Sequence, residues 1–172
     1  DDKTVQITEG ILTCKTLTTN VATSISTETS TKLTTETLLL NGNKFRMLSG
    51  NIEVTNTLTI GKTIESVEFL LETSNLVVPK CDFNGKKIAL TSGKLKCATG
   101  MKMNSGTEIT NKATLDIGKL TSIGETISIG GTGTTTISSF ELTETTKFVL
   151  TGTLNVEECS FSRHARSRKE YN

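Results

Sequence analysis

Short runs of alternating apolar residues are the feature that most constrains the fold of this chain. Ile52, Val54, Leu58 and Ile60 share one parity, with Glu and Thr residues between them. A period of two is typical of a strand that buries one face. Apolar pairs recur every six to nine residues in the middle of the chain, at positions 45/47, 52/54, 58/60, 67/69 and 76/78. This spacing predicts many very short strands.

Turn-forming residues separate these runs, as in Asn41-Gly42, Asn84-Gly85 and Gly130-Gly131. The chain contains 34 Thr residues among its 172 positions, and this β-branched side chain favours strands over helices. We find no long window with the apolar spacing of three and four that a helix needs. The sequence therefore predicts an all-β protein.

Two all-β architectures fit the pattern, a parallel β-solenoid and an antiparallel β-sandwich. Strands of a sandwich recur every 8–12 residues, which is wider than the spacing here. Three short strands would form a solenoid coil of roughly 18–25 residues, within the range of known repeats. The hydrophobic fraction of 34% also suits thin layers that each need few aliphatic side chains. We prefer the β-solenoid and keep the β-sandwich as the alternative.

The amino-acid composition varies along the chain and divides it into three parts. Residues 1–38 form a Thr/Ser-rich segment, expected to be a cap or a strand donated to a neighbouring subunit. Residues 39–161 are expected to form the β core. Residues 162–172 form a basic tail, expected to be a linker or an arm that touches an acidic partner. The basic residues of this tail are Arg163, Arg166, Arg168 and Lys169.

The four cysteines are Cys14, Cys81, Cys97 and Cys159. An even number in a β protein of this kind predicts disulfides and an oxidising compartment, although four free buried cysteines are the alternative. Cys81 and Cys97 lie sixteen residues apart, so that a disulfide would link neighbouring coils. Cys14 and Cys159 would then join the two ends of the domain, which is easier in a compact sandwich than in an elongated solenoid.

No arrangement of residues points to catalysis, a metal or a cofactor. The one histidine, His164, lies in the basic tail, and no Cys-x-x-Cys motif is present. We therefore expect a protein that is not an enzyme. The net charge of +1 does not favour nucleic-acid binding, and no apolar run approaches the roughly 18 residues that a membrane span needs.

The dense Thr and Ser residues between positions 16 and 37 are candidates for O-linked glycans or for contacts between subunits. No Asn-x-Ser/Thr acceptor for N-linked glycans occurs. The candidate positions are Thr16, Thr18, Thr19, Thr27, Thr29, Thr35 and Thr37.

Two stretches resemble known kinds of protein. Leu154-Asn-Val-Glu-Glu-Cys-Ser-Phe161 resembles a coil of extracellular parallel β-helix surface proteins, which often place a Cys two positions before a Phe. The Thr/Gly/Ile-rich run from Leu115 to Ile137 resembles viral and phage fibre shafts. Both stretches cover under a quarter of the chain, and we transfer no functional residues from either kind of protein.

These features favour an extracellular or cell-surface structural protein. We expect a subunit of a fibre or filament that assembles with copies of itself through strand edges or end-to-end contacts. The alternative is a carbohydrate-binding or adhesin module with glycans as partners. The absence of Trp weakens that alternative, because sugar rings usually stack on aromatic faces.

Overall fold

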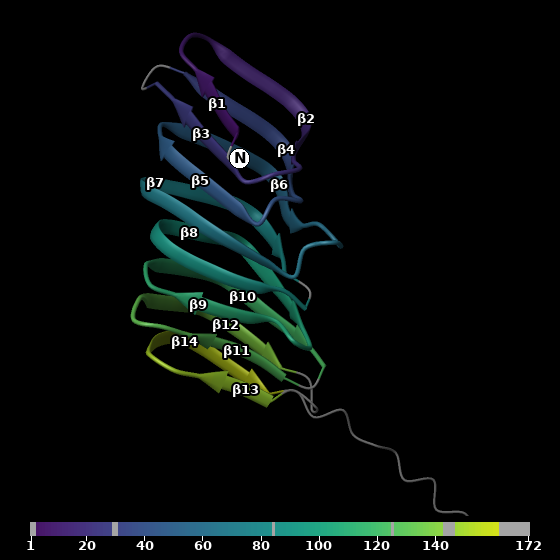
Figure 1. Cartoon of the computed structure of the whole chain (residues 1–172). Helices are drawn as coiled ribbons and strands as arrows, with labels where there is room; N and C mark the ends of the chain where they lie inside the picture. Colours follow the sequence, from purple (N-terminus) through teal and green to yellow (C-terminus); the bar gives the residue numbers. More distant parts are fainter. Residues whose placement is uncertain (1–2, 29–30, 84, 125, 143–146, 162–172) are drawn as a thin grey trace, which may run out of the picture.

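The structure is a computed structural model that describes residues 3–28, 31–83, 85–124, 126–142 and 147–161 (Figure 1). The described residues form strands and turns, with no helix among them. The strands are β1 Lys3–Ile7, β2 Ile11–Thr19, β3 Thr23–Thr27, β4 Lys32–Leu40, β5 Lys44–Ser49, β6 Asn51–Ile60, β7 Ser66–Asp82, β8 Lys87–Asn104, β9 Glu108–Asn111, β10 Thr114–Ile123, β11 Thr126–Gly130, β12 Thr134–Leu142, β13 Lys147–Leu150 and β14 Thr153–Phe161.

The chain is a parallel β-solenoid, and the prediction of that fold is confirmed. Every strand pair among the described residues is parallel, which excludes the antiparallel sandwich. Lys32 pairs with Asn51, 19 residues later, whereas Glu53 pairs with Val77, 24 residues later. Both separations lie within the coil length that the strand spacing predicts.

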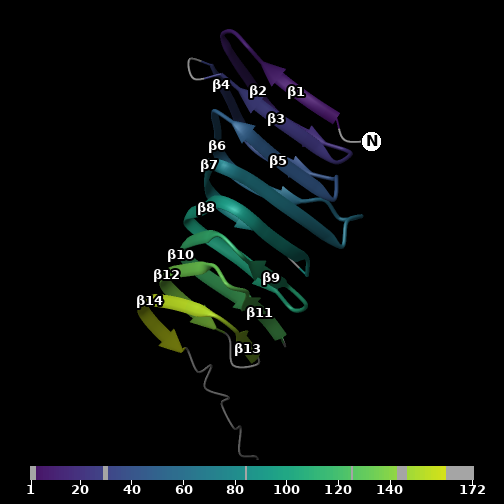
Figure 2. The same ribbon diagram turned by 60° about the vertical axis from the view of Figure 1, so that its left-hand side comes forward.

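The strands stack in eight layers, which we number from the N-terminus (Figures 1 and 2). Layers 4 and 5 each consist of one long bent strand, and every other layer consists of a shorter strand followed by a longer one. The layers are β1 and β2, β3 and β4, β5 and β6, β7, β8, β9 and β10, β11 and β12, and β13 and β14.

Each layer has three sides, because the longer strand bends at a corner. The register of β2 and β4 runs from Cys14/Thr35 to Thr16/Thr37 and omits the residues at the corner. Buried positions are two apart along one side, but Thr35 and the next buried residue, Leu38, are three apart. The extra residue at the corner keeps the apolar side chains pointing inward after the chain turns. We call the side before this corner the second side and the side after it the third side.

A narrow apolar core runs the length of the stack. Phe45 in layer 3 and Phe69 and Phe83 in layer 4 are fully buried, with ring centroids 6.0 Å apart between Phe45 and Phe69 and 6.4 Å apart between Phe69 and Phe83. Most other core positions hold Ile, Leu and Val. Each layer contributes only a few such side chains, which explains how a chain of low hydrophobic content forms a continuous core.

Some corners require glycine. Gly131 has a φ of 120°, and a Cβ atom there would lie 2.1 Å from the carbonyl oxygen of Asn111 in the preceding layer. Gly93 has a φ of 74°, and its Cβ would lie 2.6 Å from that of Leu71. Side chains at these positions would force adjacent layers apart.

The N-terminal segment is continuous with the rest of the stack. β1 to β4 form layers 1 and 2, and β1 and β2 pair with β3 and β4 of the same chain. The expected boundary between residues 38 and 39 lies inside β4, which also pairs with β6. The basic tail, residues 162–172, lies outside the described residues.

Candidate functional site

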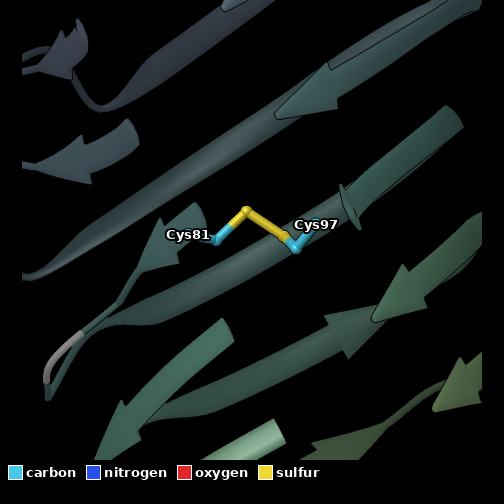
Figure 3. Close-up of a disulfide and its surroundings, with 2 residues drawn as sticks. All are labelled: Cys81 and Cys97. Atoms are coloured by element: carbon cyan, nitrogen blue, oxygen red, sulfur yellow. A yellow bond between two sulfur atoms is a disulfide. The ribbon is translucent and has the colours of Figure 1, made fainter. Parts of the chain in front are cut away.

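A disulfide joins Cys81 to Cys97, as the sequence predicts (Figure 3). Cys81 lies on the third side of layer 4, and Cys97 lies on the second side of layer 5. Their Cα atoms are 5.8 Å apart, and both residues are almost completely buried. The bond therefore links two adjacent layers inside the core.

The two bonded cysteines belong to different columns of the stack. A column is the set of residues, one from each layer, that pair with one another from layer to layer. In the first column, defined here as column A, Cys97 pairs with Val78 above and Ile117 below. In column B, Cys81 pairs with Leu58 above and Met101 below. The disulfide thus runs diagonally across the corner, from column B of one layer to column A of the next.

The two remaining cysteines occupy the first and last layers. Cys14 lies in β2, is half-buried and is free. Cys159 lies in β14, where its backbone pairs with Phe140. Seven interlayer steps of about 4.8 Å separate these two layers, or about 34 Å along the stack. A disulfide needs Cα atoms within about 7 Å, so this fold keeps Cys14 and Cys159 of one chain apart.

Cys14 and Cys159 lie in the same two columns as the cysteines of the internal disulfide. Column A begins at Cys14, which pairs with Thr35 in layer 2, and ends at Val156 in layer 8. Column B begins at Leu17 and ends at Cys159. Cys14 therefore shares a column with Cys97, and Cys159 shares a column with Cys81.

Both ends of the described stack are open. Strands β1 and β2 pair only with layer 2, and β13 and β14 pair only with layer 7, so each has one unpaired edge among the described residues. Ile11 and Leu12 at the first end are 72% and 44% exposed, and Leu150 and Val156 at the last end are 39% and 40% exposed. Leu33, which pairs with Leu12 and has a layer on each side, is only 1% exposed.

Ion pairs on the outer surface also join adjacent layers. Lys32 Nζ lies 2.7 Å from Glu53 Oε2, and this contact with its hydrogen bond lowers the pKa of Glu53 below its usual value. A set of such ion pairs, which includes this one, links consecutive layers in the same way. These pairs are Lys32–Glu53, Arg46–Glu72, Lys87–Glu108, Lys94–Asp116 and Lys119–Glu141.

The structure separates the candidate Thr residues into two groups. Thr16 and Thr18 are exposed on β2, and Thr37 is half-buried on β4. Burial makes the other described candidates inaccessible to glycan attachment in the folded chain, so we keep the O-glycan proposal for Thr16 and Thr18. The buried candidates are Thr19, Thr27 and Thr35. Thr29 lies outside the described residues, as do Arg163, Arg166, Arg168, Lys169 and His164.

A shallow polar groove runs along one corner of layers 1 to 4, with a volume of about 670 Å³. Asn20, Asn41 and Asn43 line it, together with Glu65. Asn41 Nδ2 donates a hydrogen bond to Asn20 Oδ1 at 2.9 Å. No aromatic side chain lines this groove. The described aromatic residues are mostly in the core.

Within residues 3–161, apart from the undescribed gaps, no cluster of three His, Cys, Asp or Glu residues has a metal-binding arrangement. No helix of the described chain could cross a membrane. Comparisons with protein-family models, with curated proteins and with solved structures gave no match to this chain.

Proposed function

We propose that this protein is a structural subunit of an extracellular or cell-surface fibre, built by end-to-end stacking of solenoids. The observation that carries the proposal is the pair of open ends. In layers 2 to 7, each layer is covered by parallel strands above and below, whereas layers 1 and 8 each lack one such neighbour among the described residues.

A second copy could supply the missing neighbour. Unpaired strand edges template association with another chain, and a fold whose layers contact only their neighbours accepts one more layer without rearrangement. Stacking would also cover Leu12 at one end and Val156 at the other, since their partners in covered layers, Leu33 and Ile137, are 1% and 0% exposed. Hydrogen bonding and apolar burial therefore favour the same mode of association.

The extracellular or cell-surface location rests on the disulfide. Cys81–Cys97 lies within the core, and structural disulfides of this kind persist mainly in oxidising compartments. The resemblance of Leu154–Phe161 to coils of extracellular β-helix proteins, and of residues 115–137 to fibre shafts, supports the same location and role.

Negative-stain electron microscopy of the native material tests the fibre proposal. Eight layers at about 4.8 Å predict fibres with an axial repeat of about 38 Å. Isolated particles of one-domain size at high protein concentration would contradict it.

The polar groove at Asn20, Asn41 and Asn43 favours a second candidate, a carbohydrate-binding or adhesin module. Amide groups along a groove can donate hydrogen bonds to the hydroxyl groups of a sugar chain and accept hydrogen bonds from them. The lining lacks an aromatic side chain on which a sugar ring could stack. A glycan array probed with the purified chain tests this candidate. Binding that Asn41→Ala abolishes would support it, and the absence of any bound glycan would contradict it.

A further inference from the structure

We propose that Cys159 of one copy forms a disulfide with Cys14 of the next copy, which stacks with its layer 1 on layer 8 of the first. This inference rests on the proposed fibre and specifies its polarity and its covalent link. The occupant of each open end is therefore a second copy of this chain in the same orientation.

The internal disulfide shows that cysteines in column B of one layer and column A of the next layer can form a bond. Cys81, in column B of layer 4, bonds Cys97, in column A of layer 5. Cys159 occupies column B of layer 8, and Cys14 occupies column A of layer 1. Suppose that layer 1 of the next copy continues the stack as a ninth layer. Cys14 of that copy then has the same position relative to Cys159 as Cys97 has relative to Cys81.

The ladder registers define both columns. In column B, backbone pairing is continuous from layer to layer, through Leu17, Leu38, Leu58, Cys81, Met101, Leu120, Phe140 and Cys159. Column A follows Cys14, Thr35, Val54, Val78, Cys97, Ile117, Ile137 and Val156, where the step from Val54 to Val78 extends the pairing of Glu53 with Val77 by one residue. In the continued stack, Val156 would pair with Cys14 and Cys159 with Leu17.

The charges at the same corner agree with this orientation. Glu157 lies at the corner of layer 8, between Val156 and Glu158, and is exposed. Lys15 lies at the corner of layer 1, between Cys14 and Thr16, and is also exposed. Continuing the register places this carboxylate next to this ammonium group. Opposite charges on adjacent layers are the arrangement that the ion pairs within the chain already show.

Contacts between two first ends or between two last ends lack this pairing of opposite charges. If two first ends met, no Cys159 would lie near Cys14, and the Lys15 residues of both copies would lie at the same interface. If two last ends met, Glu157 would face Glu157. Contacts of either kind would also interrupt the parallel ladder, since the strands of the two copies would then run antiparallel.

The bond can form by thiol–disulfide exchange with a small-molecule disulfide such as oxidised glutathione. The Cys14 thiolate attacks one sulfur of glutathione disulfide and releases one glutathione thiol. The Cys159 thiolate of the preceding copy then attacks the Cys14 sulfur of this mixed disulfide and releases the second glutathione. Two protein thiols are oxidised, and one glutathione disulfide is reduced to two thiols.

A complementation experiment with the full 172-residue chain tests the link. C14S retains Cys159, and C159S retains Cys14, while both keep the internal disulfide. Each variant is incubated in a glutathione redox buffer, alone and as an equal mixture, and analysed by non-reducing electrophoresis. We expect covalent dimers in the mixture only, and a ladder of longer species for the unsubstituted chain.

Peptide mass spectrometry of the oxidised, unsubstituted chain gives a readout that needs no substitution. A peptide pair linked through Cys14 and Cys159 is the expected species. Covalent dimers of C14S alone or C159S alone would overturn the proposal, because they require like ends to meet. A mixture without covalent dimers, together with no linked peptide pair, would also overturn it.

Light scattering separates this inference from the proposed fibre. If the C14S/C159S double variant assembles while the mixture shows no covalent dimer, the disulfide is excluded and the fibre stands. If the unsubstituted chain stays monomeric under both reducing and oxidising conditions, the fibre itself is excluded.

Discussion

The hydroxyl oxygen of Thr107 lies 2.8 Å from the carbonyl oxygen of Phe83, one layer earlier in the stack. It also lies 2.7 Å from the carbonyl oxygen of Asn104 and accepts a hydrogen bond from the Gly85 N–H. Thr107 is fully buried, so this polar group is satisfied by backbone groups rather than by water. The relationship shows how a Thr-rich chain can place hydroxyl groups inside its core.

Replacing Thr107 by Val should destabilise the protein by about 1–3 kcal/mol. The substitution keeps the β-branched shape but leaves backbone groups without their hydrogen-bond partner in a buried site. Urea unfolding followed by circular dichroism would measure the loss. The matched control is Thr110→Val, exposed on strand β9 that begins directly after Thr107, which should change the stability by less than about 0.5 kcal/mol. Equal effects of the two substitutions would contradict the role of the buried hydroxyl.

Removing the internal disulfide should lower the stability by about 3 kcal/mol. Cys81 and Cys97 close a loop with a sequence separation of 16, and a cross-link over such a loop restricts the unfolded chain by roughly this amount. Thermal unfolding of the C81A/C97A double variant, compared with the unsubstituted chain, would measure the change. Cys14→Ala serves as the control in dilute, unassembled protein, because Cys14 is free and half-buried within the single chain. A midpoint unchanged by the double substitution would refute this prediction.

The pKa of Glu53 should lie below its ordinary value in the folded protein, because Lys32 donates a hydrogen bond and attracts the carboxylate. The lowered pKa means that this interaction stabilises the fold above the pKa of the unfolded chain. The stabilisation is lost as the pH falls through the lower, folded-state pKa. NMR titration of the Glu53 carboxyl group would detect the shift.

Two substitutions separate the contributions of Lys32 and Thr34 to the lowered pKa of Glu53. Lys32→Gln should return the pKa of Glu53 toward its ordinary value, because it removes the largest contributions. Thr34→Val should leave most of the shift in place, since the Thr34 hydrogen bond is the smallest of the lowering contributions. An unchanged pKa in Lys32→Gln would show that another group is responsible.

Assembly should depend on the end surface and not on the lateral surface. Leu12→Lys places a charge on the 44% exposed residue at the first end, where stacking would bury it as its partner Leu33 is buried in layer 2. Ile123→Lys makes a similar chemical change at a 51% exposed position on the third side of layer 6. We expect Leu12→Lys to abolish assembly in light scattering at protein concentrations where Ile123→Lys still assembles. The reverse result would indicate lateral rather than end-to-end contacts.

Much of the fold follows from short-range patterns in the sequence. Alternation at positions 52/54 and 58/60 correctly identifies buried side chains, because the period of a strand is a local property. The predicted coil length and the Cys81–Cys97 disulfide are also confirmed, because both depend on the spacing between similar short strands.

The burial of individual Thr residues could not be predicted in this way. Thr16 and Thr35 look alike in the sequence, but Thr16 is exposed and Thr35 is fully buried. Each corner adds a residue between the two buried sets, so parity counted along the chain fails there. The position of each corner depends on packing against the layers above and below.

The sequence by itself determined the strand content and the coil length, because these depend on alternation and spacing along the chain, and it made Cys81–Cys97 a candidate disulfide that the fold then confirmed. Only the tertiary structure decided which residues share a column, since register arises from pairing between segments about 20 residues apart. That register brings Lys94 to Asp116 and places Cys14 and Cys159 in the same columns as Cys97 and Cys81. It also leaves the first and last layers with edges that no described residue pairs, a property that exists only in the folded stack.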